Sequence, residues 1–296
     1  MTRFSMKRRP SRCLAEASRS AKHPRRPASF AAAILCWLVL FAGSIPAAAQ
    51  DSPPQERISP STAGGLPAAE LLRYAPAPFE IRLPPAMPAV PPRIVRHGPR
   101  HAARIALTFD ACATRQKSAF DERLVQVLVA TQTPATLFLG GKWMAEHPEP
   151  TRYLASRAQF ELANHSYLHP RMLGLPEDRL RQEIGWTQTV MYSLTGRQAL
   201  LFRAPYAEID DRVAGVAAQM GLTSVQYDLA SGDPDPGVTA ERLVRTVVQR
   251  ARNGSIVVMH MNGRGWHTAE ALPAIIDDLR RRGFELTTVG DLIRNP

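Results

Sequence analysis

Residues 104–112 read Arg-Ile-Ala-Leu-Thr-Phe-Asp-Ala-Cys, an apolar run of strand length that ends in a carboxylate and a thiol. Asp110 and Cys112 follow where such a strand would end, and active residues of parallel α/β folds gather at the carboxyl ends of strands. A strand turns successive side chains to opposite faces, so these two side chains share a direction if the extended geometry persists, while Ala111 points away. The stretch therefore predicts a strand and the place where a site should form.

Six further apolar runs of strand length follow along the chain. They are Ala135–Leu139, Phe160–Ala163, Ala199–Phe202, Thr223–Tyr227, Ser255–Met259 and Phe284–Val289. The segments between them carry apolar residues at helical spacing, such as Leu180/Ile184 and Leu272/Ile275/Ile276. Strands that alternate with helices imply parallel pairing through right-handed crossovers. Seven strands fit an α/β fold of the (β/α) barrel type, with a doubly wound sheet as the alternative that periodicity does not separate.

The charge of the chain is concentrated at its N-terminus. The formal net charge is +11, but residues 1–49 hold nine of the 37 basic residues and one of the 26 acidic residues. The remainder is close to neutral, which argues against a broad phosphate-binding face. We therefore expect no nucleic-acid partner.

The basic N-terminal segment leads into the apolar run Ala31–Gly43, and small residues follow as far as Ala49. This order is typical of a secretory signal, with cleavage after Ala49. The apolar run is shorter than the ~20 residues of a spanning helix. We expect residues 1–49 to be a signal peptide and the mature protein to be exported, periplasmic or secreted, without stable membrane insertion. An uncleaved N-terminal anchor is the alternative.

Residues 50–100 form a proline-rich segment, since 51–100 contain 12 of the 26 prolines. Proline fixes φ and removes a hydrogen-bond donor, so this segment predicts an extended linker or a wrapping arm. Phe79–Leu83 is the one stretch in it that could pair as an edge strand. The predicted organisation is a signal at 1–49, an arm at 50–100 and one domain at 101–296.

Five polar clusters each follow a predicted strand, and we expect them to meet at one edge of the sheet. They occupy residues 107–112, 163–170, 202–206, 227–234 and 258–260. The second contains His165-x-x-x-His169, whose imidazoles could converge on one metal ion from a single helical turn. Two unrelated surface histidines are the plainer alternative. A carboxylate from the first strand favours the metal site.

The order of these motifs resembles the polysaccharide deacetylase family, whose unit is the NodB homology domain of carbohydrate esterase family 4. The motifs are Thr-Phe-Asp at 108–110, His-Ser-x-x-His at 165–169, Arg-x-Pro-Tyr at 203–206, then Asp233 and His260. The resemblance covers about residues 103–294. It implies a distorted seven-stranded (β/α) barrel and metal-dependent removal of N-acetyl groups from an amino-sugar polysaccharide such as peptidoglycan or a chitin-like glycan.

The resemblance also implies a role for each matching residue. Asp110 corresponds to the general base, Arg203 to the arginine that orients it, Tyr206 to the tyrosine whose backbone amide holds the oxyanion, His260 to the general acid, and Asp233 to the partner of that acid. His165 and His169 correspond to metal ligands. The implied cofactor is a divalent metal, which we expect to be Zn²⁺, and the implied partner is an acetylated glycan.

The chain departs from the family pattern at Ala111, where the family has a second aspartate that ligates the metal. Cys112 could supply a thiolate instead, or Asp110 or water could complete the metal shell. A third alternative is that metal binding is weak or absent and the domain is a non-catalytic glycan-binding module. Cys112 could equally be a small buried residue that fills the strand end. An O-acetyl esterase would use the same site, and the sequence indicates neither the glycan nor the oligomeric state.

One further departure lies near the site. Asp233 is followed by Pro234 where the family often has tryptophan, so one aromatic wall of the sugar groove is missing. Trp266 could replace that aromatic ring, or it could pack between the last helix and the barrel.

Overall fold

The computed structural model describes residues 79–294, and all strand pairing in this part is parallel. The strands are β1 (Ile94–Val95), β2 (Arg104–Ala111), β3 (Ala135–Leu139), β4 (Phe160–Asn164), β5 (Leu201–Phe202), β6 (Thr223–Val225), β7 (Leu229–Ala230), β8 (Ile256–His260) and β9 (Glu285–Thr287). Each of the seven predicted strands is present, and β1 and β7 are additional.

The strand order is β1-β6-β5-β4-β3-β2-β8-β7, and β9 pairs with the first half of β2. From β2 to β6 each strand lies beside the next one in the chain, whereas a doubly wound sheet reverses its order at a switch point. Among the described residues β7 pairs only with β8, so the curled sheet is open between β6 and β7. The predicted barrel is confirmed in this open form.

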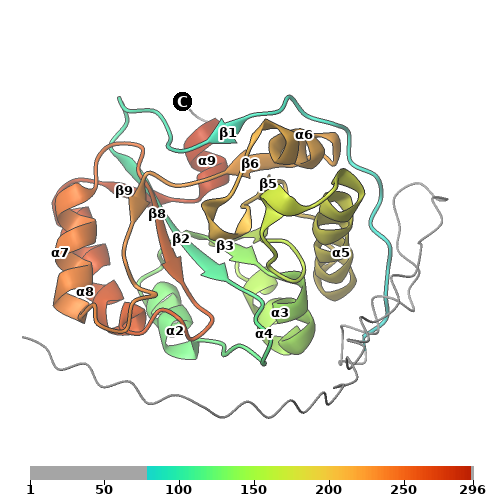
Figure 1. The fold of residues 1–296 in the computed structure, drawn as a ribbon. Coiled ribbons are helices and arrows are strands. Elements are labelled where there is room, and N and C mark those ends of the chain that lie inside the picture. The colour runs from blue at the N-terminus through green and yellow to red at the C-terminus, as the bar shows by residue number, and fades with distance from the viewer. Residues whose placement is uncertain (1–78, 295–296) are drawn as a thin grey trace, which may run out of the picture. The chain divides into compact units, whose positions relative to one another are not determined.

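Helices connect the strands and cover the outside of the sheet (Figure 1). They are α2 (Glu122–Ala130), α3 (Gly141–Glu146), α4 (Pro148–Ser156), α5 (Glu177–Thr195), α6 (Asp211–Gln219), α7 (Ala240–Arg250), α8 (Thr268–Arg281) and α9 (Val289–Arg294), with short 3-10 turns at Met172–Gly174 and Pro205–Ala207. Side-chain caps begin several of them. Asp121 accepts the N–H of Leu124 at 3.0 Å, and Asp210 accepts that of Val213 at 2.8 Å.

The two faces of β2 belong to different parts of the core. Alternate residues of the strand pack in the large cluster between sheet and helices: Ile105, Leu107, Phe109 and Ala111. Ala106 belongs instead to a second cluster inside the barrel, with Phe138 and Ile256. The strand period of two therefore directs Thr108 and Asp110 to the inside of the barrel and Ala111 to the helices.

The described part of the arm, residues 79–100, contacts the barrel at α5 and at β6. Phe79–Leu83 forms no strand. The N–H of Arg82 instead donates to Ser193 Oγ of α5 at 2.8 Å, and two prolines follow directly. Ile94–Val95 pairs with β6 and extends the sheet at that edge. The described part of the segment therefore wraps the barrel, while residues 50–78 lie outside the described residues.

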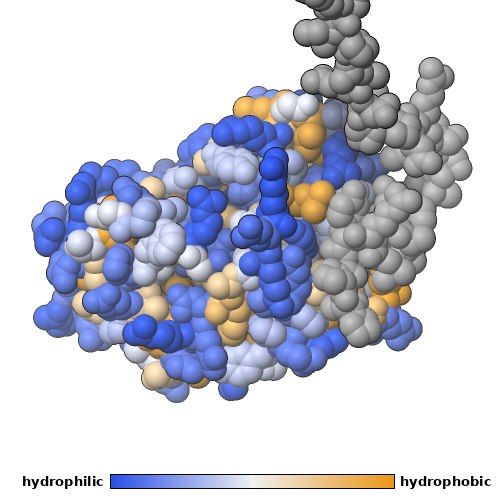
Figure 2. Space-filling model, turned by 60° about the horizontal axis from the view of Figure 1, so that its bottom comes forward, coloured by the Kyte–Doolittle hydropathy of each residue, from blue (hydrophilic) through white to orange (hydrophobic). Residues whose placement is uncertain are grey.

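The described residues include no helix that is long and apolar enough to cross a membrane. The apolar run at 31–43 lies outside this range. On the face shown in Figure 2 the surface is mostly hydrophilic, and the apolar residues form small separate groups. Scattered apolar residues of this kind are ordinary on a protein surface.

Candidate active site

The carboxyl ends of the strands surround a cavity of about 290 Å³. All seven residues that received a role from the sequence line this cavity: Asp110, His165, His169, Arg203, Tyr206, Asp233 and His260. Cys112 lines it as well, whereas Ala111 is fully buried in the core on the opposite face of β2. The polar clusters therefore meet at one place, and the expected common direction of Asp110 and Cys112 is confirmed.

Asp110 is buried and paired with Arg203. Its Oδ1 accepts a hydrogen bond from Arg203 Nη1 at 2.7 Å, and the same nitrogen lies 2.8 Å from Thr108 Oγ1. The Arg203 guanidinium is stacked on Phe138, 3.8 Å from the ring centroid. Burial alone would raise the pKa of Asp110, but the positive charges of Arg203, His165 and His260 outweigh it and the pKa is lowered. The carboxylate is therefore held ionised at the cavity wall.

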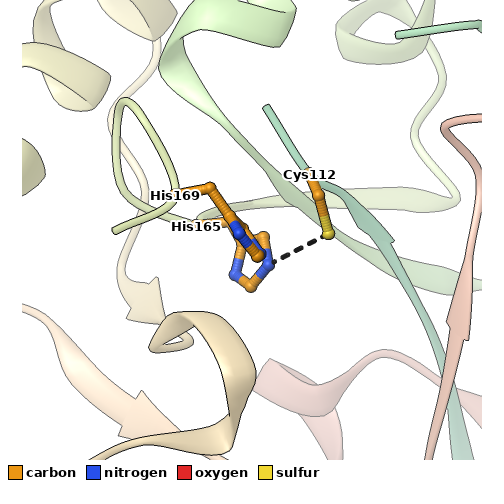
Figure 3. Close-up of side chains that lie close together, drawn as sticks. All are labelled: Cys112, His165 and His169. Atoms are coloured by element: carbon orange, nitrogen blue, oxygen red, sulfur yellow. Dashed lines mark hydrogen bonds between the residues drawn. The ribbon is translucent and has the colours of Figure 1, made fainter. Parts of the chain in front are cut away.

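His165 is oriented by a backbone carbonyl. Its Nδ1 donates to the carbonyl oxygen of Arg203 at 2.9 Å, and since a carbonyl only accepts, this contact assigns the proton to Nδ1. Nε2 then faces Cys112, whose Sγ lies 3.7 Å away (Figure 3). A ring nitrogen fixed in this way is the usual arrangement of a metal-binding histidine.

The segment 165–169 is a loop, so the predicted helical turn is wrong. Ser166 and His169 both have positive φ, 61° and 60°. Glu183 of α5 holds the loop, because its Oε2 accepts the N–H groups of Tyr167 at 2.9 Å and Leu168 at 2.8 Å. The imidazoles still converge, with ring centroids 5.0 Å apart. They converge through the loop's hydrogen bonds and not through helical periodicity.

Glu183 was missed by the sequence reasoning. It is fully buried, and its Oε1 accepts from Arg179 at 2.6 Å. The available signal was an acid beside Ile184, on the apolar face that begins at Leu180. An acid on the buried face of a helix indicates a polar partner inside the protein.

Cys112, His165 and His169 form one group of potential metal ligands. Their ligand atoms all lie within 4.8 Å of one another, and all three residues are buried (Figure 3). Burial alone would raise the pKa of the Cys112 thiol, but hydrogen bonds from His165, His169 and His260 lower it well below its usual value. A thiolate and two imidazoles are donors that suit a divalent transition metal.

Partly buried His260 and buried Asp233 form a second pair. His260 Nδ1 lies 3.0 Å from Asp233 Oδ1, and the His260 backbone N–H donates to Oδ2 at 2.6 Å. The hydroxyls of Ser231 and Thr268 also donate to this carboxylate. Burial alone would lower the pKa of His260, but hydrogen bonds with Asp233 and Cys112 and the charges of Asp233 and Asp110 raise it to about 10.

Aromatic side chains flank the cavity. Tyr206 has φ 57°, the residue is 54% exposed, and its ring centroid lies 4.6 Å from that of His169. Tyr227 lines the cavity just after β6, and it belongs to the polar cluster 227–234, in which the sequence reasoning gave it no role of its own. Trp266 is 58% exposed and lies outside the cavity lining, so its ring neither replaces the missing wall there nor packs in the core.

Three features define a hydrolase site at the mouth of a (β/α) barrel: a buried carboxylate that can act as a base, an imidazole paired with a buried carboxylate, and a cluster of side chains that can ligate a metal. The family model for polysaccharide deacetylase matches residues 97–225. The chain belongs to the polysaccharide deacetylase family, and the prediction of such an enzyme is confirmed at the level of its family.

Three relatives illustrate the likeness. A peptidoglycan-N-acetylglucosamine deacetylase of Bacillus cereus is 27% identical over 199 residues, which are 67% of this chain and 70% of that protein. A family 4 carbohydrate esterase from Streptomyces lividans, solved in complex with acetate, is 30% identical and has a TM-score of 0.54. The match covers 62% of this chain and 91% of that one. A family 4 pseudoenzyme from Bacillus anthracis, at 24% identity, has a TM-score of 0.62 over 69% of each chain. The last likeness concerns the fold alone, so activity must be argued from the site.

Proposed function

We propose that this protein hydrolyses N-acetyl groups on an extracytoplasmic amino-sugar polysaccharide, peptidoglycan or a chitin-like glycan, with the help of bound Zn²⁺. The observation that carries the proposal is the cavity itself. Asp110 backed by Arg203 and His260 backed by Asp233 line the same cavity as the imidazoles of His165 and His169. The Bacillus cereus relative, by its name, acts on N-acetylglucosamine in peptidoglycan.

Each protein group has a task in the hydrolysis. Bound Zn²⁺, held by the two histidines, would supply Lewis acidity that activates water and polarises the acetyl carbonyl. Asp110 takes a proton from the attacking water through Oδ2, since Oδ1 is occupied by Arg203. The backbone N–H of Tyr206 donates to the oxyanion that forms on the acetyl oxygen.

Departure of the sugar amine requires a proton, because an amine anion is a very poor leaving group. His260 faces the cavity and its Nδ1 is engaged by Asp233, so Nε2 is the atom that delivers this proton. Water adds to the acetyl carbon, the carbon–nitrogen bond breaks, and acetate and a free amine leave.

Two buried carboxylates argue for catalysis over glycan binding alone. Taking Asp110 and Asp233 out of water costs several kcal/mol per ion before their partners offset it, on the order of what buried ions require. A lectin-like groove needs no such groups. A non-catalytic module is therefore the poorer account of this cavity.

Acetate release tests the proposal directly. The Zn²⁺-loaded protein should release acetate from N-acetylated chitooligosaccharides or peptidoglycan, and His165→Ala, which removes a metal ligand, should not. No release from any N-acetylated glycan by metal-loaded protein would contradict the proposal. Release from acetylated xylan alone would instead identify an O-acetyl esterase.

We also propose that residues 1–49 are removed on export, which places the enzyme where such glycans occur. The support is the order of basic, apolar and small residues ending at Ala49. N-terminal sequencing of the extracytoplasmic protein should find a start at Gln50. A mature chain that begins at Met1 would contradict cleavage and favour an anchored protein.

A further inference from the structure

We propose that Cys112 is the third protein ligand of the metal, as a thiolate, so that the centre is a Cys-His-His site that selects Zn²⁺ and similar thiophilic ions. The inference rests on the proposed function only for the presence of a metal. Catalytic zinc sites generally have three protein ligands, and His165 and His169 supply two. Ala111, which follows the proposed base, offers no donor and is buried against the helices.

The register of β2 brings the thiol to the cavity. Side chains alternate along a strand, so the residue two positions after Asp110 returns to the same face. The backbone at Cys112 is fixed by two hydrogen bonds to its carbonyl oxygen, from Ser118 Oγ at 3.0 Å and Asn262 Nδ2 at 2.9 Å. The thiol is therefore held in position from two separate loops.

The distances fit a tetrahedral zinc site. With Zn–S near 2.3 Å and Zn–N near 2.0–2.1 Å, a sulfur and a nitrogen on one tetrahedral ion lie roughly 3.6 Å apart. Cys112 Sγ and His165 Nε2 are 3.7 Å apart. The ligand atom of His169 lies within 4.8 Å of both. The three donors thus already have nearly the separation that one ion requires.

Asp110 is a poorer candidate for the third ligand. Its Oδ1 is occupied by Arg203, and its carboxylate is not in the group of donors that lie within 4.8 Å of one another. Ligation by Cys112 leaves the other oxygen of Asp110, Oδ2, to act as the base, 3.8 Å from His165 Nε2. In this arrangement Cys112 binds the metal and Asp110 acts as the base.

A packing role alone does not explain the surroundings of Cys112. A small apolar filler should contact apolar side chains, yet Cys112 lines the cavity with Asp110, His165 and His169. A thiolate also changes metal preference, since sulfur ligands favour zinc over magnesium, calcium or manganese. The chain should therefore bind Zn²⁺ or Co²⁺ far better than Mg²⁺.

The test uses the full chain with Cys13→Ser and Cys36→Ser, so that Cys112 is its one thiol. With Co²⁺ bound, this protein should show a thiolate-to-cobalt charge-transfer band in the near ultraviolet. Cys112→Ser should lose the band and bind Zn²⁺ at least ~10–100-fold more weakly. In a matched control, Cys112→Ala with Ala111→Cys moves the thiol by one residue and should also show no band.

X-ray absorption of the zinc-loaded protein supplies a readout that needs no variant, with one sulfur expected at about 2.3 Å. A cobalt- or zinc-loaded protein without a sulfur signal, or unchanged affinity in Cys112→Ser, would overturn the inference. These outcomes are separate from the activity. A sulfur signal without acetate release would contradict the proposed function and leave Cys112 as a ligand. Acetate release without a sulfur signal would support the proposed function and contradict ligation by Cys112.

Discussion

The ends of β2 and β8 present the same kind of ion pair to the cavity in opposite order. At β2 the carboxylate of Asp110 faces the cavity and the cation of Arg203, 1% exposed, lies behind it. At β8 the imidazole of His260 faces the cavity and the carboxylate of Asp233, also 1% exposed, lies behind it. The group in front determines the chemistry and the group behind determines its protonation. One arrangement favours an ionised base and the other a protonated acid.

Removing the charge of Asp110, the carboxylate that faces the cavity at the end of β2, should have the largest effect on turnover. Asp110→Asn keeps the size of the side chain but cannot accept a proton, so turnover should fall by ~10²–10⁴-fold. Stability should fall too, by about 3–5 kcal/mol, because Arg203 is left as a buried cation without its anion. Steady-state kinetics and thermal unfolding measure the two effects. Near-normal turnover would show that Asp110 is not the base.

Removing the charge of Asp233, the carboxylate behind His260 at the end of β8, should change the pH dependence of activity. The hydrogen bond and charge of Asp233, together with Cys112 and Asp110, raise the pKa of His260 to about 10, so the imidazole is protonated below that pH and loses its proton as pH rises through it. In Asp233→Asn the alkaline limit of kcat/KM should move down towards the ordinary value of ~6.5. An unchanged alkaline limit would mean that His260 is not the acid.

The same shift predicts a change in stability. A histidine whose pKa is raised on folding stabilises the fold fully below pH ~6.5, and this contribution is lost between that pH and about 10. The free energy of unfolding of the wild type should therefore decrease over that interval. Asp233→Asn should lose most of this slope, which urea unfolding at a series of pH values would measure.

The end of β4 differs from both, because the loop that follows β4 is held by backbone N–H groups that donate to the Glu183 carboxylate. Glu183→Ala leaves the N–H groups of Tyr167 and Leu168 without their acceptor, and Zn²⁺ affinity should fall ~10–100-fold. Glu183→Gln should restore part of the affinity, since its amide oxygen can still accept. Glu177→Ala, on an exposed part of the same helix, is the control and should leave affinity unchanged.

The smallest effect is expected from Thr268, which donates one of the hydrogen bonds to Asp233 at 2.8 Å. Thr268→Ala should cost about 0.5–1.5 kcal/mol of stability, because the carboxylate keeps its contacts with Ser231 and His260. The alkaline limit of activity should hardly move. A large shift would show that the hydroxyl, and not the His260 contact, positions the carboxylate.

Local periodicity explains which predictions succeeded. The apolar runs gave all seven predicted strands, and Ala135–Leu139 has the same bounds in the structure. The two-residue strands β1 and β7 carry too little pattern to be recognised, and β1 lies in a segment that proline content marks as irregular. Phe79–Leu83, the stretch that could have paired as an edge strand, forms none, because its backbone is bound by a side chain of α5, 111 residues away.

The sequence by itself determined the seven strands, the convergence of the motifs at their carboxyl ends and the shared direction of Asp110 and Cys112, because alternation along a strand is a local property. The strand order, which separates the barrel from a doubly wound sheet, came only from the tertiary structure. Only the tertiary structure decided the partners. Arg203 enters the barrel to pair with Asp110 across 93 residues of chain, and Glu183 reaches a loop in which helical periodicity plays no part. Such contacts depend on where separate elements meet in space, and residue spacing within one element carries no information about that distance.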